Sequence, residues 1–382
     1  MMKSWLVGLA AMTWTGSAMA QSKPETWLTR LGRDTVAFER FTRTKDKLEG
    51  DLVSTTPKTR TTHYVVSFNA DGTVRRIEFS AKSPVEGAGS PPPAEGFAEF
   101  DANGILAVIT RAGKTDTTRV AASAGAVPWT LNSWGLLQLT LDRARESGGS
   151  ATVDQYPLGG TRVNKSAVSE AGDSVAVSFF GSPLMVKVDR KGQLVGVDGG
   201  RTTVKIKAEP VGLDLAKLTE AFAARDRAGH STGQLSTRDT VRATVAGAEL
   251  WIDYGRPAKR GRRIIGGLVP YDTVWRTGAN AATQFRTSVA LEIGKTTIPA
   301  GTYTLWTIPT TRGVKLIFNK QTGQWGTEYH PEQDFARVEM DDEKLDDLVE
   351  RFTISVAPEP SGGAIRFDWD HTRWAVRFKP KA

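Results

Sequence analysis

The chain has 382 residues, more than a single hydrophobic core usually serves, so we expect two domains. Its 50 Lys and Arg exceed its 42 Asp and Glu, and the formal charge of +8 allows attraction to anionic partners. The sequence contains no cysteine, which excludes disulfides, zinc–thiolate sites and a cysteine nucleophile.

The first twenty residues have the pattern of a secretory signal peptide. Lys3 precedes an apolar run from Trp5 to Trp14, and Ala18-Met19-Ala20 matches the small-residue pattern of a cleavage site. The run is too short to anchor the chain across a bilayer, and no later stretch is apolar for long enough to cross one. We therefore expect cleavage after Ala20 and a periplasmic or secreted protein.

Alternating apolar residues predict a β-rich N-terminal domain over residues 21–228. The expected strands are residues 35–41, 47–54, 62–68, 74–79, 175–180, 184–188, 194–197 and 203–206. A hairpin turn is expected at residues 69–72, and the proline-rich residues 83–96 are expected to form a loop.

Two helices are expected in the same domain. Leucines recur over residues 132–145 and a Gly-Gly pair follows, which predicts an amphipathic helix with a stop signal. A second helix is predicted over residues 213–228, before a linker at 229–237. The expected fold is a curved antiparallel β-meander with two helices, a shape that can wrap an apolar groove.

A second β-rich domain is predicted over residues 238–382, where many short strands and turns favour a β-sandwich. The expected strands are residues 241–245, 250–254, 283–293, 301–308, 314–318, 335–340, 352–356, 364–369 and 374–378. Leu345, Leu348 and Val349 have helical spacing and predict a helix over residues 341–351, with three carboxylates in its first turn.

Several motifs resemble catalytic or metal sites but lack the necessary context. Residues 229–233 spell the G-x-S-x-G nucleophile elbow, yet the strand that must precede it is replaced by a helix. Residues 294–296 resemble the end of a phosphate-binding loop, but Val289 stands where that loop requires glycine. The histidines, His63, His230, His330 and His371, do not have metal-ligand spacing, so we expect neither metal nor cofactor.

The turn-rich residues 254–283 concentrate arginine, tryptophan and amide groups, which can bind anions, stack on sugars and orient hydroxyls. Residues 259–263 are either a solvated basic loop or an anion-binding one. A second group of aromatic and charged residues lies at 325–337. The candidate ligand-binding residues are Arg256, Arg262, Trp275, Arg276, Asn280, Trp325, Tyr329, Asp334 and Arg337. The alternative is that they support the fold, with Arg276 pairing a carboxylate such as Asp334 and Arg337 pairing the same acid.

These motifs also carry a family resemblance. The segment 254–283, together with Ala300-Gly301-Thr302-Tyr303, Ile317-Phe318-Asn319-Lys320, Thr322-Gly323-Gln324-Trp325-Gly326 and Asp334-Phe335-Ala336-Arg337-Val338, resembles the bacterial domain-of-unknown-function 2911 family. The resemblance runs from about Val241 to the C-terminus and does not extend over the N-terminal half. It implies an extracytoplasmic β-rich domain, and it supplies no catalytic residues.

Three functions follow from these observations. The first is a non-catalytic binding protein for an anionic or glycan-like small molecule or envelope polymer, with no nucleic acid as partner. The second is a structural or lipid-carrying envelope assembly protein. The third is a hydrolase that uses Asp334 or His330 as general base and Arg276 to stabilise an oxyanion.

Overall fold

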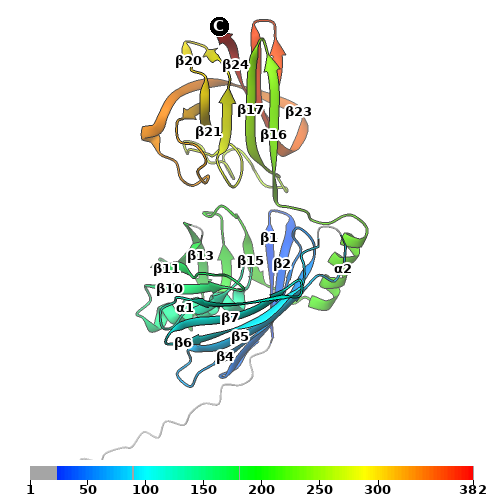
Figure 1. Ribbon diagram of the computed structural model, residues 1–382, viewed down its shortest axis with the longest axis vertical. Coiled ribbons are helices and arrows are strands. Elements are labelled where there is room, and N and C mark those ends of the chain that lie inside the picture. The colour runs from blue at the N-terminus through cyan, green and yellow to red at the C-terminus, as the bar shows by residue number, and fades with distance from the viewer. Residues whose placement is uncertain (1–23, 88–89, 180, 382) are drawn as a thin grey trace, which may run out of the picture.

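The computed structural model describes residues 24–87, 90–179 and 181–381. It is mainly antiparallel β-structure arranged in two large sheets, one in each half of the chain (Figure 1). The mainly β prediction is confirmed. The expected signal peptide lies outside the described residues. Within them, no helix is both long and apolar enough to cross a membrane.

The N-terminal sheet has fifteen strands among the described residues, in the order β8-β7-β6-β5-β4-β3-β2-β1-β15-β14-β13-β12-β11-β10-β9. All neighbours are antiparallel except β9 and β10. The strands are β1 (Glu25–Leu31), β2 (Asp34–Arg43), β3 (Lys47–Ser54), β4 (Arg60–Phe68), β5 (Val74–Lys82), β6 (Ala94–Asp101), β7 (Gly104–Arg111), β8 (Lys114–Val120), β9 (Val127–Trp129), β10 (Ala151–Pro157), β11 (Asn164–Ala171), β12 (Ser174–Phe179), β13 (Ser182–Val188), β14 (Leu194–Asp198) and β15 (Lys207–Pro210).

Helix α1 (Trp134–Glu146) occupies the concave face of this curved sheet (Figure 1). Its apolar side chains, including Leu136, Leu137, Leu139 and Leu141, are buried in one core with residues from strands on both sides. Two small concavities of about 10 and 190 Å³ adjoin the helix. The predicted helix is confirmed, and it fills the space that an apolar groove would need. The lipid-carrying alternative stays a prediction.

Glu39 fixes the start of α1 inside the sheet. Its fully buried carboxylate accepts hydrogen bonds from Tyr64 Oη at 2.8 Å and Ser133 Oγ at 2.5 Å. It also accepts from the backbone N–H groups of Trp134 at 2.6 Å and Gly135 at 3.1 Å. The carboxylate thus satisfies two N–H groups at the start of α1 that have no partner within the helix. Burial nevertheless outweighs these hydrogen bonds and raises the pKa of Glu39.

We expect the Glu39→Gln variant to change the pH dependence of stability. Because the pKa of Glu39 is raised, the folded state keeps its proton at pH values where the unfolded chain has released it. The contribution of Glu39 to the free energy of unfolding is therefore lost as pH rises from the ordinary glutamate pKa through the raised one. Denaturant titrations across this range should show the wild type losing stability relative to Glu39→Gln.

The matched control is Glu49→Gln. The pKa of the half-exposed Glu49 is lowered, first by its hydrogen bond with Lys47, so its contribution is lost as pH falls. The difference between wild type and Glu49→Gln should therefore change in the opposite direction and by less. Parallel pH profiles of the wild type and Glu39→Gln would show that Glu39 does not titrate between the folded and unfolded states as described.

Helix α2 (Leu215–Arg227) lies on the outer face of the sheet. Its apolar residues Leu215, Leu218 and Phe222 pack against side chains of β1, β2 and β3. Asp214 caps its first turn by accepting from the N–H groups of Ala216 and Lys217, which confirms the second predicted helix. Residues 228–235 then lead to the second sheet (Figure 1).

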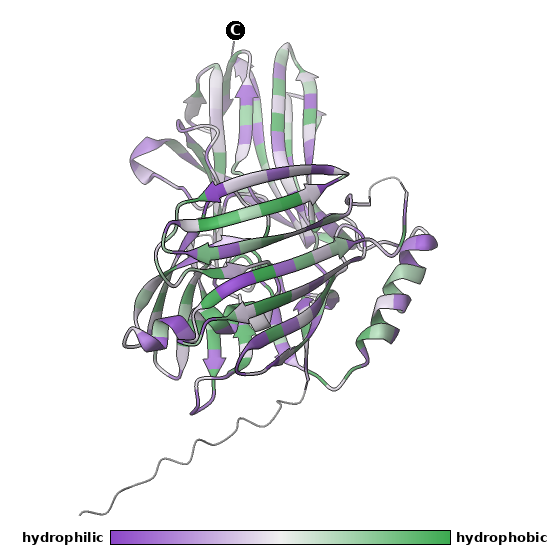
Figure 2. Cartoon of the chain, turned by 60° about the horizontal axis from the view of Figure 1, so that its bottom comes forward, coloured by the Kyte–Doolittle hydropathy of each residue, from purple (hydrophilic) through white to green (hydrophobic). Residues whose placement is uncertain are grey.

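In the described part of the chain the C-terminal sheet has nine strands, in the order β16-β17-β18-β21-β22-β23-β24-β19-β20. Its two longest strands curve, so β23 also packs against β16 and β17 in a β-sandwich-like arrangement. The strands are β16 (Ser236–Val245), β17 (Ala248–Pro257), β18 (Thr283–Thr287), β19 (Ala290–Ile293), β20 (Thr296–Ile298), β21 (Gly301–Thr310), β22 (Gly313–Asn319), β23 (Asp334–Glu359) and β24 (Gly362–Lys381), with a 3-10 turn at Pro331–Gln333. Figure 2 shows the alternation of polar and apolar residues along several of these strands.

The predicted helix over residues 341–351 is wrong, because this segment lies within β23. Asp341 and Glu343 are not capping acids: they pair with Arg377 of the neighbouring strand. Leu348 is half exposed, and the pairing with β24 shifts register on both sides of Val349. The segment therefore has leucines at helical spacing in sequence, while cross-strand ion pairs and the pairing with β24 hold it extended.

Three other predicted segments also differ in the structure. The expected strand at 283–293 is two strands, β18 and β19, which lie in different parts of the sheet. The loop predicted for residues 83–96 ends earlier, because β6 begins at Ala94. Residues 203–206 form a loop rather than a strand: Thr202 Oγ1 accepts from the N–H groups of Val204 and Lys205, and Lys205 has a positive φ of 58°.

Candidate functional site

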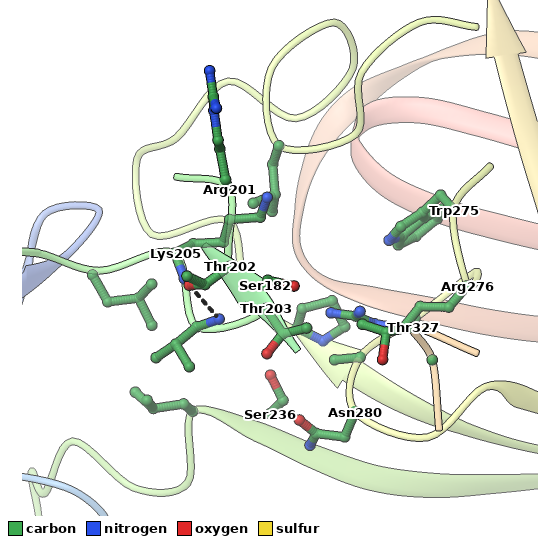
Figure 3. Close-up of a pocket in the computed structure, with 18 of the residues that line it drawn as sticks. Ser182, Arg201, Thr202, Thr203, Lys205, Ser236, Trp275, Arg276, Asn280 and Thr327 are labelled. Carbon is green, nitrogen blue, oxygen red and sulfur yellow. Dashed lines mark hydrogen bonds between the residues drawn. The ribbon is translucent and has the colours of Figure 1, made fainter. Parts of the chain in front are cut away.

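A pocket of about 830 Å³ lies between the two domains, within the size range of small-molecule sites. The N-terminal domain contributes the β1 end, the start of β13 and the loop before β15. The C-terminal domain contributes the turn-rich residues 268–280 and 326–329. Figure 3 shows Arg276, Asn280 and Thr327 of one domain facing Ser182 and Thr203 of the other.

All charged side chains that line this pocket are positive. They are Arg201, Lys205, Arg262 and Arg276, and the described lining contains no aspartate or glutamate. Burial, and then the charges of Arg276 and Arg262, lower the pKa of Lys205. Cations from both domains therefore lie close enough to repel one another in a partly dehydrated space, which favours an anion between them.

Arg276 has the most unusual environment of the four. Its side chain is largely withdrawn from water, its Nε is buried without a hydrogen-bond partner, and no carboxylate in the described chain forms an ion pair with it. Burial lowers the pKa of this guanidinium. A buried cation is normally paired, so an unpaired guanidinium in a pocket indicates a place for an anionic ligand.

The backbone next to Arg276 is held in a strained conformation. Thr277 has a φ of 51°, which is rare for a β-branched residue. Its carbonyl accepts from Thr283 Oγ1 at 2.6 Å, and its hydroxyl lies 3.3 Å from Thr307 Oγ1. Trp275 exchanges two backbone hydrogen bonds with Thr307 of β21. These contacts fix the direction in which Arg276 leaves the backbone.

Gly326 leaves room for the Arg276 side chain. A Cβ at this position would lie 2.0 Å from Arg276 Cδ and 2.4 Å from the carbonyl oxygen of Asn280. The Gly326 N–H donates to that same carbonyl at 3.0 Å, so the turn at 280 and the turn at 326 are tied together. A side chain at 326 would force one of them to move.

Aromatic side chains form another part of the pocket wall. Trp275 stacks on Trp369 with ring centroids 5.7 Å apart and an interplanar angle of 18°. The ring centroids of Trp306 and Tyr329 are 4.9 Å apart. All four are in the pocket lining, but Trp306 and Trp369 are buried, so the aromatic surface that the pocket exposes comes from Trp275 and Tyr329.

The N-terminal domain presents its part of the pocket on a braced loop. Gly199 donates its N–H to the Ile206 carbonyl at 2.7 Å, closing the loop, and Thr202 Oγ1 donates to the Gly199 carbonyl at 2.8 Å. Lys205 Nζ donates to the Gly200 carbonyl at 2.7 Å. The loop is therefore held by its own hydrogen bonds rather than left free.

The loop of residues 258–263 contacts the N-terminal domain. Arg260, only 5% exposed, forms an ion pair with Asp34 of β2, and its carbonyl accepts from the Arg33 N–H at 3.0 Å. Gly32 permits this approach, since a Cβ there would lie 2.3 Å from the Arg260 oxygen. Glu350 holds the loop from the other side by accepting from the Arg260 N–H at 2.8 Å.

We expect Asp34 and Arg260 to couple energetically. Asp34 is about one third exposed, so a double-mutant cycle with Asp34→Ala and Arg260→Ala should give a coupling of about 1–2 kcal/mol rather than the full value of a buried pair. Denaturant unfolding measures it, and proteolysis within residues 228–235 should become faster in Asp34→Ala. Arg33→Ala is the control, because Arg33 lies 3.9 Å from Asp34 and is exposed. Additive effects of the first pair would contradict this interdomain contact.

The structure brings together five of the predicted site residues: Arg262, Trp275, Arg276, Asn280 and Tyr329 all line the pocket. In the basic loop of residues 259–263, Arg263 is exposed, as expected for a solvated loop. Lys259 instead pairs with Asp370 at 2.5 Å, and Arg260 pairs with Asp34. Arg262 is the member that reaches the pocket.

The other four candidates lie outside the pocket lining. Arg256 pairs with Asp239 at 3.0 Å and donates to β23. Trp325 is 43% exposed. Asp334 and Arg337 pair with each other at 2.6 Å, as the structural alternative predicted, and Asp334 is not a partner of Arg276.

Asp334 has several hydrogen-bond donors around it. Besides Arg337 it accepts from Tyr329 Oη at 2.6 Å and Asn319 Nδ2 at 2.9 Å, and burial together with Asp334 raises the pKa of Tyr329 to about 12. His330 is exposed and lies 3.0 Å from Glu332. Among the described residues no group of three or more histidines and carboxylates could hold a metal ion.

Sequence reasoning missed the N-terminal half of the pocket. Ser182, Arg201, Thr202, Thr203 and Lys205 line it but were not candidates. Nothing in the sequence around Arg201 and Lys205 distinguishes them from other surface residues. They become part of the pocket only because segments far apart in the sequence lie together. The one usable signal was the Gly-Gly-Arg-Thr-Thr run at 199–203, whose turn residues argue against a strand.

Comparison with known proteins adds a family match for the C-terminal part of the chain. Residues 236–378 match the model of DUF2911, described as a protein of unknown function, which confirms the resemblance and its extent. No curated protein matches the chain. A crystal structure of a DUF1089 family protein from Pseudomonas aeruginosa is similar over part of the chain. The alignment covers 42% of this chain and 89% of the DUF1089 chain, with 14% sequence identity and a TM-score of 0.32.

Proposed function

We propose that the protein is a non-catalytic binding protein that holds an anionic, glycan-like small molecule in the pocket between its domains. The observation that carries this proposal is Arg276, a largely dehydrated guanidinium without a carboxylate partner in a pocket without acidic residues. A ligand carboxylate or phosphate would supply the missing acceptor for the Arg276 fork.

The uncharged part of the lining supports the class of ligand. Trp275 and Tyr329, both partly exposed, offer aromatic surface, while Ser182, Thr203 and Asn280 offer hydroxyl and amide groups. This combination suits a molecule with one apolar face and many hydroxyls, such as an acidic sugar. We also propose, from the N-terminal signal pattern, that the protein acts in the periplasm or outside the cell.

Catalysis is less well supported by the geometry. Asp334, the first candidate base, is held by Arg337, Tyr329 and Asn319 and does not line the pocket. A general base must reach the proton that it removes, and it needs a pKa suited to that task. The hydrolase alternative stays a prediction.

We expect Arg276→Ala to abolish ligand-dependent stabilisation. Thermal unfolding of the wild type against a panel of uronic acids, sugar phosphates and muropeptides should identify a ligand, since an anion at a hundred times its dissociation constant adds about 2.7 kcal/mol. Arg276→Ala should lose this shift because it removes the bidentate donor, and Arg276→Lys should retain only part of it.

Arg263→Ala is the matched control for charge. Arg263 belongs to the same segment, is exposed and does not line the pocket, so this variant should behave as the wild type with every compound. If Arg276→Ala kept the full shift while remaining folded, the pocket would not be the binding site.

Gly326→Ala provides a test that leaves every charge in place. The added methyl displaces Arg276 or the turn at Asn280, so ligand affinity should fall at least about tenfold, as expected when a charged hydrogen bond worth about 1.5–3 kcal/mol is misplaced. Isothermal calorimetry measures the affinity. Gly212→Ala is the control, because nothing lies within 4 Å of a Cβ at that position. Unchanged affinity in Gly326→Ala would separate Arg276 from binding.

A further inference from the structure

The outer face of the C-terminal sheet carries a row of residues in register across four strands. Arg242 of β16 pairs with Trp251 of β17, Trp251 with Arg286 of β18, and Arg286 with Thr302 of β21. Residues opposite one another in a sheet point to the same face, so the row places one tryptophan between two arginines. Strand spacing puts the backbones of the two arginines about 10 Å apart.

This row lines a concavity of about 730 Å³ together with polar residues of the same edge, including Thr244, Glu249 and Ser288. Arg242 and Arg286 are exposed, and neither forms an ion pair within the described chain. Trp251 is partly exposed and has no aromatic partner there. The concavity shares no lining residue with the interdomain pocket, so it is a separate surface.

We propose that this row binds a strand of acidic polysaccharide. The apolar face of a sugar ring packs on the Trp251 indole, and the arginine on each side donates to carboxylates of the same chain. Two unpaired cations with no acid between them are complementary to a ligand whose charges repeat along its length. The open sheet face accommodates an extended chain rather than an enclosed small molecule.

The composition of the row favours a polysaccharide over a nucleic acid. The exposed carboxylate of Glu249 lines the same concavity, where it can accept hydrogen bonds from sugar hydroxyls. Single-stranded nucleic acids are also bound by aromatic residues that stack successive bases, whereas this row contains one tryptophan.

The test is calorimetric binding of an oligogalacturonate to the full chain. Arg242→Ala/Arg286→Ala should weaken binding at least about tenfold, because charge-assisted hydrogen bonds at two positions are lost. Trp251→Phe should bind nearly as the wild type and Trp251→Ala more weakly. Arg312→Ala, which removes an exposed arginine from the β21–β22 turn, should bind as the wild type.

Other probes decide against the alternatives. The methyl-esterified oligomer, which lacks charge, should bind much more weakly. The double arginine change should weaken binding equally in the Arg276→Ala background, where the interdomain pocket no longer contributes. Unchanged affinity in the double arginine variant in either background would overturn the proposal. Equal or tighter binding of an oligothymidylate of the same length would overturn it as well, in favour of nucleic acid.

Discussion

The contact between Arg260 and Asp34 ties the two halves of the chain together beside the interdomain pocket. Arg260 is almost completely removed from water, a state that costs several kcal/mol for an ion and requires a partner of opposite charge. Asp34 comes from the other domain, so the charge is satisfied only when the loop 258–263 lies against the turn between β1 and β2. The same contact brings Arg262 towards Lys205.

Arg260 and Arg276 illustrate two uses of the same residue type. Arg260 has its carboxylate within the chain, so it contributes to the arrangement of the domains. Arg276 is partly exposed, but its Nε is buried and has no partner, and a strained Thr277 and a glycine at 326 keep the side chain in place. A cost that the folded chain leaves uncompensated is more often a feature of a binding site than of a scaffold.

Much of the fold was predictable because it depends on local pattern. Strands such as β3 and helices α1 and α2 follow from alternation, leucine spacing and capping residues. The segment 341–351 was not predictable from the same rules. Its leucines have helical spacing, while the interactions that keep it extended are with Arg377, a residue far along the chain.

The site was predictable to a smaller extent, for a related reason. Trp275, Arg276 and Asn280 could be found because glycine and proline mark an unusual segment with many hydrogen-bonding groups. Arg256 and Arg337 looked the same in sequence, and only the structure shows that Asp239 and Asp334 neutralise them.

What separates a binding arginine from a structural one is thus the presence of a carboxylate within a few ångströms, which is a property of tertiary contacts. Arg242 and Arg286 also have no ion pair in the described chain, a property they share with other exposed arginines such as Arg263 and Arg312. Their side chains differ from Arg276 in being exposed, so water screens their charge and they need a neighbour such as Trp251 to add specificity. The two surfaces therefore suit different ligands: an enclosed anion for the pocket, and a long chain with repeated charges for the sheet.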